Sequence, residues 1–396
     1  MNIINVPSLE GKRVLIRVDF NVPLDSDLRI SDDSRMIAAL PTIKKTIKNN
    51  GKAIIMSHLG RPKNCFEKKF SLKNIVKHLS GLLQTNVEFS EYCIGPKAYK
   101  RVQNLKNGGV LVLENLRFYS EEKSGNEHFA KELAKLGDIY INDAFGTAHR
   151  AHASTSVIAK FFPKNKYLGS LFMAEMHALN KVLSAPKRPL TAIIGGSKIS
   201  GKINIIKSLI AKVDVLIIGG GMAYTFAKAL GGKVGKSLVE DEKIALAKTL
   251  LNEAKNNGVD FLLPTDSINA DQFSNKAAIN NSPICSIDEK YMGLDIGNES
   301  ILKFSKKILA SKTIIWNGPM GVFEMSNFES GTKKVASAIC LATQKGAFSL
   351  VGGGDSVAAI KKFNLEGCVS YVSTGGGAML EYLEGKKLPA ISAILS

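Results

Sequence analysis

Basic side chains gather at the ends of predicted strands in the first half of the sequence. His58 and Arg61 follow the second apolar run, Arg117 follows the third, and Arg150 comes shortly after the fourth. Several arginines aimed at one crevice repel each other unless an anion joins them, and a guanidinium group binds phosphate or carboxylate through two parallel hydrogen bonds. The pattern predicts a site for a small anion, although each of these side chains alone is better explained as a surface or structural residue.

Glycine clusters mark the ends of predicted strands in the second half. They occupy residues 195–196, 219–221, 352–354 and 375–377. Glycine lets backbone N–H groups approach an anion closely, and a helix N-terminus adds a favourable dipole. Asp355, directly after the third cluster, is suited to hold Mg²⁺ beside phosphates. One such cluster is often only a tight strand-to-helix turn, but four of them indicate a nucleotide-binding lobe.

Residues 196–202 match the spacing GxxxxGK of a P-loop. The next residue is Ile203, where a P-loop needs Ser or Thr to reach Mg²⁺. The cluster at 195–196 also ends the strand already. We therefore do not expect a P-loop here.

The elements that position these residues are short apolar runs separated by helix-length amphipathic stretches. The runs lie at 13–20, 52–57, 109–113 and 138–142, and then at 190–194, 214–218, 260–263, 312–316, 348–351 and 370–372. Most lack period-2 alternation, which is typical of strands buried on both faces of a parallel sheet. The predicted fold is therefore α/β, with two lobes, each an open and mostly parallel Rossmann-like sheet flanked by helices.

A predicted helix near the middle of the chain separates the two lobes. Apolar residues at 168–184 follow i, i+3, i+4 spacing, and Ala185-Pro186 ends the pattern. We predict a first domain at 1–170, a joining helix at 171–184 and a second domain at 185–379. The alternative is that this helix is an ordinary surface helix within one lobe.

Composition limits the classes of protein to consider. The 396 residues carry 53 Lys and Arg against 35 Asp and Glu, a formal charge of +18. The basic residues form no long run, so scattered surface lysines are favoured over a nucleic-acid footprint. The five cysteines form no CxxC motif or metal cluster, which fits a reducing compartment. No signal peptide is visible in 1–20 and no membrane-length apolar run is present, so we expect a soluble cytoplasmic protein.

In its motifs the sequence resembles the phosphoglycerate kinase family, in family order over nearly the whole chain. The motifs are KRVLIRVDFNVP (12–23), SHLGRP (57–62), ENLRF (114–118), NDAFG (142–146), AHR (148–150), GGGMA (219–223), MGLDIG (292–297), WNGPMGVFE (316–324), GGDS (353–356) and STGGGA (373–378).

The resemblance implies reversible phosphoryl transfer between ATP and the carboxylate of 3-phosphoglycerate, with Mg²⁺, giving ADP and 1,3-bisphosphoglycerate in glycolysis or gluconeogenesis. It assigns 3-phosphoglycerate to the first lobe, on Asp19, Asn21, Arg35, His58, Arg61, Arg117 and Arg150. It assigns adenine and ribose to Gly220, Gly293, Pro319 and Glu324. It assigns the nucleotide phosphates to Lys202, Asn317, Gly353, Gly354, Asp355 and Ser356, with Asp355 holding the metal. Its catalytic residues are Arg35, Lys198, Gly354 and Gly376.

The resemblance also implies a monomer whose lobes close around the two ligands, and a C-terminal stretch, 380–396, that packs back on the first lobe. Two positions depart from the family's pattern. Gly201 stands where many members have Asp, which leaves open how the closed state is held, and Ser356 stands where many have Thr. Ser356 keeps the hydroxyl group, so phosphate binding should survive.

Two other functions remain to be compared with this one. A different ATP-dependent enzyme that makes an acyl phosphate, such as an acetate-kinase-like protein, is disfavoured by the ordered motifs. A nucleic-acid-binding protein is suggested only by the charge of +18, and the sequence has no recognised nucleic-acid motif and a single Trp. We therefore expect small-molecule substrates, no membrane association and no specific nucleic-acid partner.

Overall fold

The computed structural model describes residues 8–63 and 65–396, and the chain divides into two compact units. The first unit runs up to His177 and includes Lys387–Ser396; the second unit is Ala178–Lys386. Of the stretch 1–20 that was inspected for a signal peptide, residues 1–7 lie outside the described residues. Within the part that the structure describes, no helix has both the length and the apolarity to cross a membrane.

The first unit is built on a six-stranded sheet in which every pair of neighbours is parallel. Its strand order is β3 (Val87–Ser90), β4 (Val110–Leu113), β2 (Lys52–Met56), β1 (Arg13–Val18), β5 (Ile139–Asp143) and β6 (Lys166–Leu168). The predicted runs at 13–20, 52–57, 109–113 and 138–142 all form strands. The short strands β3 and β6 were not predicted, because four and three residues are too few for a clear apolar run.

Helices of the first unit cover its sheet with apolar faces. In α1 (Ser34–Lys48), Met36, Leu40 and Ile43 are buried at helical spacing against the core that also contains Ile16 and Ile55. The other helices are α2 (Lys73–Leu83), α3 (Pro96–Asn104), α4 (Ser120–Ser124), α5 (Glu127–Ala134) and α14 (Pro389–Leu395). Short 3₁₀ turns are η2 (Lys68–Phe70), η3 (Leu116–Phe118), η4 (Phe145–Thr147) and η5 (Val157–Phe161).

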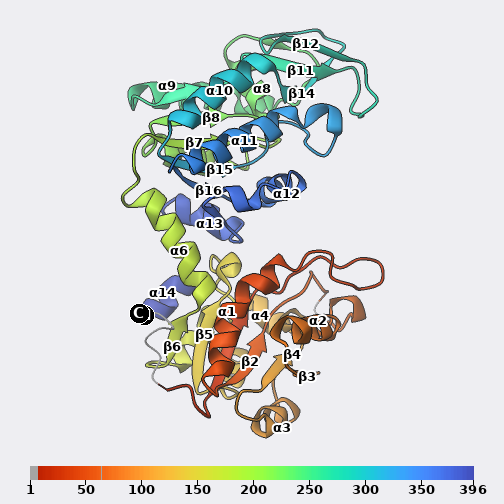
Figure 1. Ribbon diagram of the computed structural model, residues 1–396, viewed down its shortest axis with the longest axis vertical. Coiled ribbons are helices and arrows are strands. Elements are labelled where there is room, and N and C mark those ends of the chain that lie inside the picture. The colour runs from red at the N-terminus through yellow and green to blue at the C-terminus, as the bar shows by residue number, and fades with distance from the viewer. Residues whose placement is uncertain (1–7, 64) are drawn as a thin grey trace. The chain divides into compact units, whose positions relative to one another are not determined.

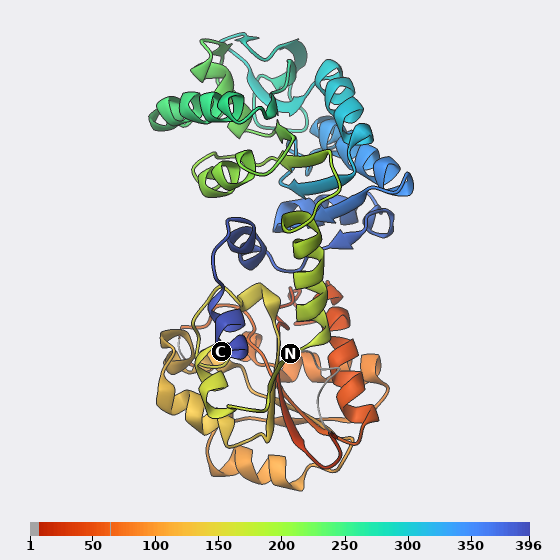
Figure 2. The same cartoon turned by 90° about the vertical axis from the view of Figure 1, so that its left-hand side faces the viewer.

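The second unit contains another parallel six-stranded sheet. Its order is β10 (Asp260–Leu262), β8 (Val215–Ile218), β7 (Leu190–Ile194), β15 (Thr313–Asn317), β16 (Phe348–Val351) and β17 (Tyr371–Val372). Figure 2 shows α8 (Met222–Ala229) and α9 (Ile244–Asn256), in green, on one side of this sheet and α10 (Asn298–Ala310) and α11 (Ser330–Gln344), in cyan and blue, on the other. The remaining helices are α7 (Ile203–Ile210), α12 (Gly354–Lys362) and α13 (Gly377–Leu383), with 3₁₀ turns η6 (Asp241–Lys243), η7 (Ser326–Phe328) and η8 (Glu366–Cys368).

Two small sheets in the second unit were not predicted. One is antiparallel, with β12 (Ile279–Pro283), β11 (Asp266–Ala270) and β14 (Met292–Ile296) in that order. The other pairs β13 (Ser286–Ile287) with β9 (Lys233–Val234). Strand β12 reads INNSP and has no buried residue, so apolar patterning gave no signal for it. The predicted α/β class with two parallel sheets is nevertheless confirmed.

The chain leaves the first unit through α6 (Ser170–Leu183) and returns to it at the end. Figure 1 shows α14, in dark blue, beside β6. Ala390 N donates to the Ala148 carbonyl at 3.1 Å, and Lys166 Nζ donates to the Ala393 carbonyl at 2.9 Å. The predicted boundary at 379/380 differs from the structure, since it falls inside α13. Ser208 Oγ donates to the Leu383 carbonyl at 2.9 Å, and this contact helps keep residues up to Lys386 with the second unit.

Candidate active site

Candidate residues of the first unit lie at the carboxyl ends of four strands. Strand order reverses between β1 and β5, and open α/β sheets bind ligands at such a switch point. The seven predicted residues come from the segments after β1, β2, β4 and β5 and from the first turn of α1. In chain order they are Asp19 and Asn21, Arg35, His58 and Arg61, Arg117, and Arg150.

Hydrogen bonds tie three of these segments together. Arg35 donates to Asp19 Oδ2 at 3.2 Å and to the Asn21 carbonyl at 3.1 Å. The loop after β2 is held from two sides, because Gly60 N donates to Asn21 Oδ1 at 2.8 Å and Arg117 donates to the Gly60 carbonyl at 2.7 Å. Arg150 Nε lies 3.1 Å from His149 Nε2. Arg61 follows Gly60 directly, and no hydrogen bond to its side chain is found in the described residues.

The basic side chains of these segments form a cationic cluster, and their positive charge exceeds the negative charge that faces it. Burial, together with Arg17 and Arg150, lowers the pKa of Arg117 to about 10. Burial and the cations Arg17 and Arg117 lower the pKa of His58 well below its usual range, so the ring is neutral at pH 7. Burial first, and then neighbouring arginines, lower the pKa of His152 to about 4. The arrangement favours an anionic ligand that would relieve this repulsion.

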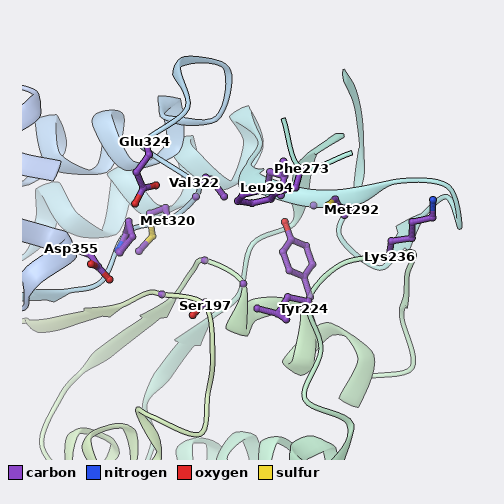
Figure 3. A pocket seen from close by; sticks show the side chains of 17 residues that line it. Ser197, Tyr224, Lys236, Phe273, Met292, Leu294, Met320, Val322, Glu324 and Asp355 are labelled. Carbon is purple, nitrogen blue, oxygen red and sulfur yellow. The ribbon is translucent and has the colours of Figure 1, made fainter. Parts of the chain in front are cut away.

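The second unit contains a cavity of about 530 Å³ between its parallel sheet and the small antiparallel sheet. Figure 3 shows Glu324 and Asp355 at the opposite end of this cavity from Lys236, with Tyr224, Phe273, Met292 and Leu294 between them. Of the predicted nucleotide residues, five line the cavity, namely Gly220, Gly293, Pro319, Glu324 and Asp355. An elongated, largely apolar slot with carboxylates at one end suits a base and a ribose.

Phosphate-binding candidates form a connected network beside this cavity. Lys202 Nζ donates to Asn317 Oδ1, and Asn317 Nδ2 donates to the Gly352 carbonyl at 2.7 Å. Ser356 Oγ accepts from Gly318 N at 2.5 Å, so its hydroxyl joins two strand-end loops. Burial lowers the pKa of Lys202, and the Asp355 carboxylate opposes that shift.

Gly353 is a position beside this network where only glycine fits. Its φ is +94°, and a Cβ there would lie 2.3 Å from Asn317 Nδ2. It precedes α12, whose first turn holds Gly354, Asp355 and Ser356. The free amides of a helix N-terminus and its dipole favour phosphate at this point.

Lys198 and Gly376 complete the set of predicted catalytic residues. Lys198 is exposed in the loop after β7. Against the effect of burial, hydrogen bonds from Ser200 and from the Ile199 amide lower the pKa of Glu240, and the charge of Lys198 adds to this shift. Gly376 precedes α13 with φ +50°. Neither residue lines the cavity. A Cβ on Gly201 would meet nothing within 4 Å, so the absence of the family's Asp there has no steric cause.

Comparison with known proteins identifies the family. A family model described as phosphoglycerate kinase matches residues 4–386. Phosphoglycerate kinase of Porphyromonas gingivalis is 52% identical over 408 residues, covering 97% of each chain. Phosphoglycerate kinase 1, chloroplastic, of Arabidopsis thaliana is 51% identical over 386 residues, covering 98% of this chain and 80% of the relative. The solved structure of phosphoglycerate kinase from Coxiella burnetii superposes with a TM-score of 0.90 at 41% identity, covering 100% of this chain and 98% of that one.

The chain belongs to the phosphoglycerate kinase family. It is a kinase of glycolysis that transfers a phosphoryl group between ATP and 3-phosphoglycerate. The sequence-based expectation of this family and activity is confirmed. This family assignment is favoured over the two alternatives considered for the main activity, an acetate-kinase-like enzyme and a nucleic-acid-binding protein.

Sequence reasoning missed several residues of both candidate sites in this phosphoglycerate kinase. The cavity is also lined by Ser197, Tyr224, Lys236, Phe273 and Val322. Ser197 and Val322 lie inside the segments 196–202 and 316–324, but neither was assigned a role there. Lys236 and Phe273 come from loops and Tyr224 comes from α8, and no motif marked them. Behind the cationic cluster, Arg17 and Glu122 are each 1% exposed. Arg17 could have been noticed, because it is a charge at the centre of an apolar run.

Gly293→Ala is predicted to weaken nucleotide binding, because the new Cβ would lie 2.1 Å from Tyr224 Oη. Tyr224 is buried and hydrogen-bonded to Ser267 Oγ at 2.7 Å, so it cannot move freely. We expect MgADP affinity to fall by about tenfold or more, as for an overpacked site costing ~1–3 kcal/mol. Calorimetric titration of ADP would check this. An unchanged ADP affinity in the folded variant would show that Gly293 does not shape the nucleotide site.

Proposed function

We propose that the cationic cluster of the first unit binds 3-phosphoglycerate and that the cavity and glycine loops of the second unit bind ATP or ADP. The observation that carries the first assignment is the uncompensated charge around Arg117, whose pKa of about 10 reflects burial beside Arg17 and Arg150. A doubly charged phosphate and a carboxylate suit such a cluster, because arginine pairs with both through parallel hydrogen bonds. The residues proposed to contact this substrate are Asp19, Asn21, Arg35, His58, Arg61, Arg117 and Arg150.

For the nucleotide we propose a division between base and phosphates. Gly220, Gly293 and Pro319 would contact the adenine, with Glu324 on the ribose hydroxyls; all four line the cavity. The phosphates would lie over the loop and first turn of α12, where backbone amides are free to donate. The proposed phosphate-binding residues are Lys202, Asn317, Gly353, Gly354, Asp355 and Ser356.

The acceptor requires no general base. A carboxylate with a pKa near 4 is already ionised at neutral pH, unlike the alcohol acceptors of many kinases. The barrier is the approach of an anionic nucleophile to an anionic phosphoryl group. We propose that Arg35, Lys198 and the backbone amides near Gly354 and Gly376 neutralise the charge that develops on the transferring oxygens.

Mg²⁺ is proposed to bind with the nucleotide at Asp355. Among the described residues, no group of three or more His, Cys, Asp or Glu side chains is arranged for a metal. A single carboxylate beside a phosphate loop still fits Mg²⁺, which usually takes one or two carboxylates and completes its shell with phosphate oxygens and water. When bound, the ion neutralises phosphate charge. Asp355 meets this description, since it lies in the first turn of α12 and lines the cavity.

We further propose that the protein acts as a cytoplasmic monomer with no specific nucleic-acid partner. The cysteines at 65, 93, 285, 340 and 368 are all free thiols, which suits a reducing compartment. Two of the relatives are named as chloroplastic, so the family works in more than one compartment.

The test of these assignments is a coupled assay with 3-phosphoglycerate, MgATP and a dehydrogenase that consumes 1,3-bisphosphoglycerate. We expect Asp355→Ala to lower Mg²⁺-dependent turnover by about 10²-fold or more, as for the loss of a charge-stabilising group, while 3-phosphoglycerate binding is unchanged. Asp241→Ala, at an exposed acidic residue of the same unit, is the matched control. Full turnover in Asp355→Ala would show that the metal is held elsewhere.

A further inference from the structure

Arg17 is a buried cation, and every nitrogen of its side chain has a hydrogen-bond partner. It lies in β1 and is 1% exposed. Its Nε donates to Ser154 Oγ at 2.8 Å, and one terminal nitrogen donates to the Val18 carbonyl. The other terminal nitrogen lies 3.2 Å from His58 Nδ1. Burying a guanidinium group costs several kcal/mol unless a counter-charge and hydrogen bonds compensate.

The counter-charge is Glu122, which Arg17 reaches through Ser154. Glu122 is 1% exposed and accepts from Ser154 Oγ at 2.6 Å and from Ser154 N at 3.0 Å. A serine hydroxyl has one proton, so Ser154 Oγ accepts from Arg17 and donates to Glu122. His152 Nδ1 lies 3.9 Å from Glu122 Oε1, beyond hydrogen-bond distance. The chain Glu122–Ser154–Arg17 therefore has a single possible direction of donation.

The contact with Arg17 determines which nitrogen of His58 carries the proton. A guanidinium group can only donate, so His58 Nδ1 must accept from Arg17 and be unprotonated. The ring is then the neutral tautomer with its proton on Nε2. The Asp19 carboxylate is 3.7 Å from Nδ1, which is longer than the contact with Arg17. Arg35, Arg117 and His152 also face the ring, and all of them oppose a positive charge on it.

The remaining ring nitrogen is available to a ligand. Across residues 8–63 and 65–396, no protein group is hydrogen-bonded to His58 Nε2, and Nε2 is not among the fully buried atoms that lack a partner. A ligand in the cationic cluster could therefore accept a hydrogen bond from Nε2–H.

We propose that Arg17, supported by Ser154 and Glu122, is a positioning residue that holds His58 as the neutral Nε2–H tautomer, so that the ring donates to bound 3-phosphoglycerate. The proposal rests on the proposed function of this site. A deprotonated Nε2 would present a lone pair to the substrate anion and repel it. Arg17 thus acts on the substrate through His58, without contacting it.

The first measurement is the tautomer of His58 in the full-length protein, read from the side-chain ¹⁵N shifts and assigned by comparison with His58→Gln. At pH 7 we expect a protonated Nε2 and an unprotonated Nδ1 in the native protein. Arg17→Met is expected to give mixed tautomers and a pKa of His58 shifted upward. An Arg17→Met protein with an unchanged tautomer and an unchanged titration would overturn the proposal. Arg101→Met, an exposed arginine on α3 in the same unit, is the control.

The second measurement separates positioning from a general structural role. We expect Arg17→Met to raise the KM for 3-phosphoglycerate by about tenfold with little change in MgATP affinity, as for one lost hydrogen bond to a charged group. In the His58→Gln background the same change should have little further effect, because His58 is the route of its influence. An equal loss in both backgrounds would overturn the proposal.

Two further variants keep the test decisive. If Arg17→Met fails to fold, Ser154→Ala removes the bridge to Glu122 and leaves Arg17 Nε without its acceptor, so the guanidinium group should be held less firmly against His58 and the tautomer balance should shift in the same direction. A native tautomer balance in Ser154→Ala would overturn the role of the bridge. The proposed site itself is tested separately by His58→Ala. An unchanged KM there would contradict the substrate assignment, whereas the tautomer result would still stand.

Discussion

Replacing Lys198 by alanine is expected to lower kcat by ~10²–10³-fold, the effect of removing one group that stabilises developing charge. The affinity for MgATP should change only a few-fold, because Lys198 is exposed in the loop after β7 and does not line the nucleotide cavity. An interaction made only in the transition state lowers kcat without a matching loss of ground-state binding. Steady-state kinetics and calorimetric titration of ATP would measure the two effects.

Lys248→Ala is a matched control for this prediction, since Lys248 is an exposed lysine on α9 in the same unit. Lys198→Arg keeps the charge and should retain part of the activity. A near-normal kcat in Lys198→Ala would contradict the catalytic assignment. A large loss of ATP affinity with normal kcat would instead place Lys198 among the binding residues.

Arg117→Met is expected to weaken 3-phosphoglycerate binding and to stabilise the ligand-free protein. The folded protein disfavours the charged guanidinium, because burial first and then Arg17 and Arg150 lower its pKa to about 10, well below the usual value for arginine. A cation whose pKa is lower in the folded state destabilises that state fully below its folded pKa of about 10, and the effect fades as pH rises from there to the higher pKa of the unfolded chain. At pH 7 its removal should therefore raise the unfolding free energy, by on the order of 1 kcal/mol after the lost bond to Gly60 is counted.

Whereas the unfolding free energy of Arg117→Met should rise, its affinity for 3-phosphoglycerate should fall. Loss of charge-assisted hydrogen bonds worth ~2–3 kcal/mol corresponds to roughly a 30- to 150-fold rise in the KM for 3-phosphoglycerate. Thermal unfolding without ligand and initial-rate kinetics would give both quantities. Arg117→Lys keeps the charge without the planar fork and should fall between the two proteins in KM. An unchanged KM in Arg117→Met would remove Arg117 from the substrate site.

The parallel sheets were predictable because a strand that is buried on both faces appears in the sequence as a continuous run of apolar residues. Strands β2 and β4 each show it over four residues. The positions of His58, Arg61 and Arg117 followed directly, since parallel strands place their carboxyl ends at one edge. The glycine loops were predictable because glycine is needed where φ is positive or where a neighbouring group leaves no room for a Cβ. Gly353 meets both conditions, since its φ is positive and Asn317 is a close neighbour.

The walls of the nucleotide cavity and the second layer of the anion cluster could not be predicted in this way. Phe273 is an exposed aromatic in a loop, and its place beside the cavity depends on the small antiparallel sheet. Glu122 is separated from Ser154 by 32 positions, so only the folded chain reveals that their side chains meet. Such residues work through contacts between distant segments, and a pattern read along one segment does not contain them.

The return of the chain to the first unit affects the order in which the protein can fold during synthesis. Helix α14 supplies the acceptor for Lys166 Nζ and the donor for the Ala148 carbonyl, yet it is translated only after the whole of the second unit. Residues Ala178–Lys386 must be made first, which takes roughly 10–40 s at typical rates of 5–20 residues per second. During that interval the nascent first unit presents the docking surface of α14 uncovered, on η5 and β6, to other proteins in the cell. Chaperone engagement and premature termination should therefore act most strongly on the half of the protein that leaves the ribosome first.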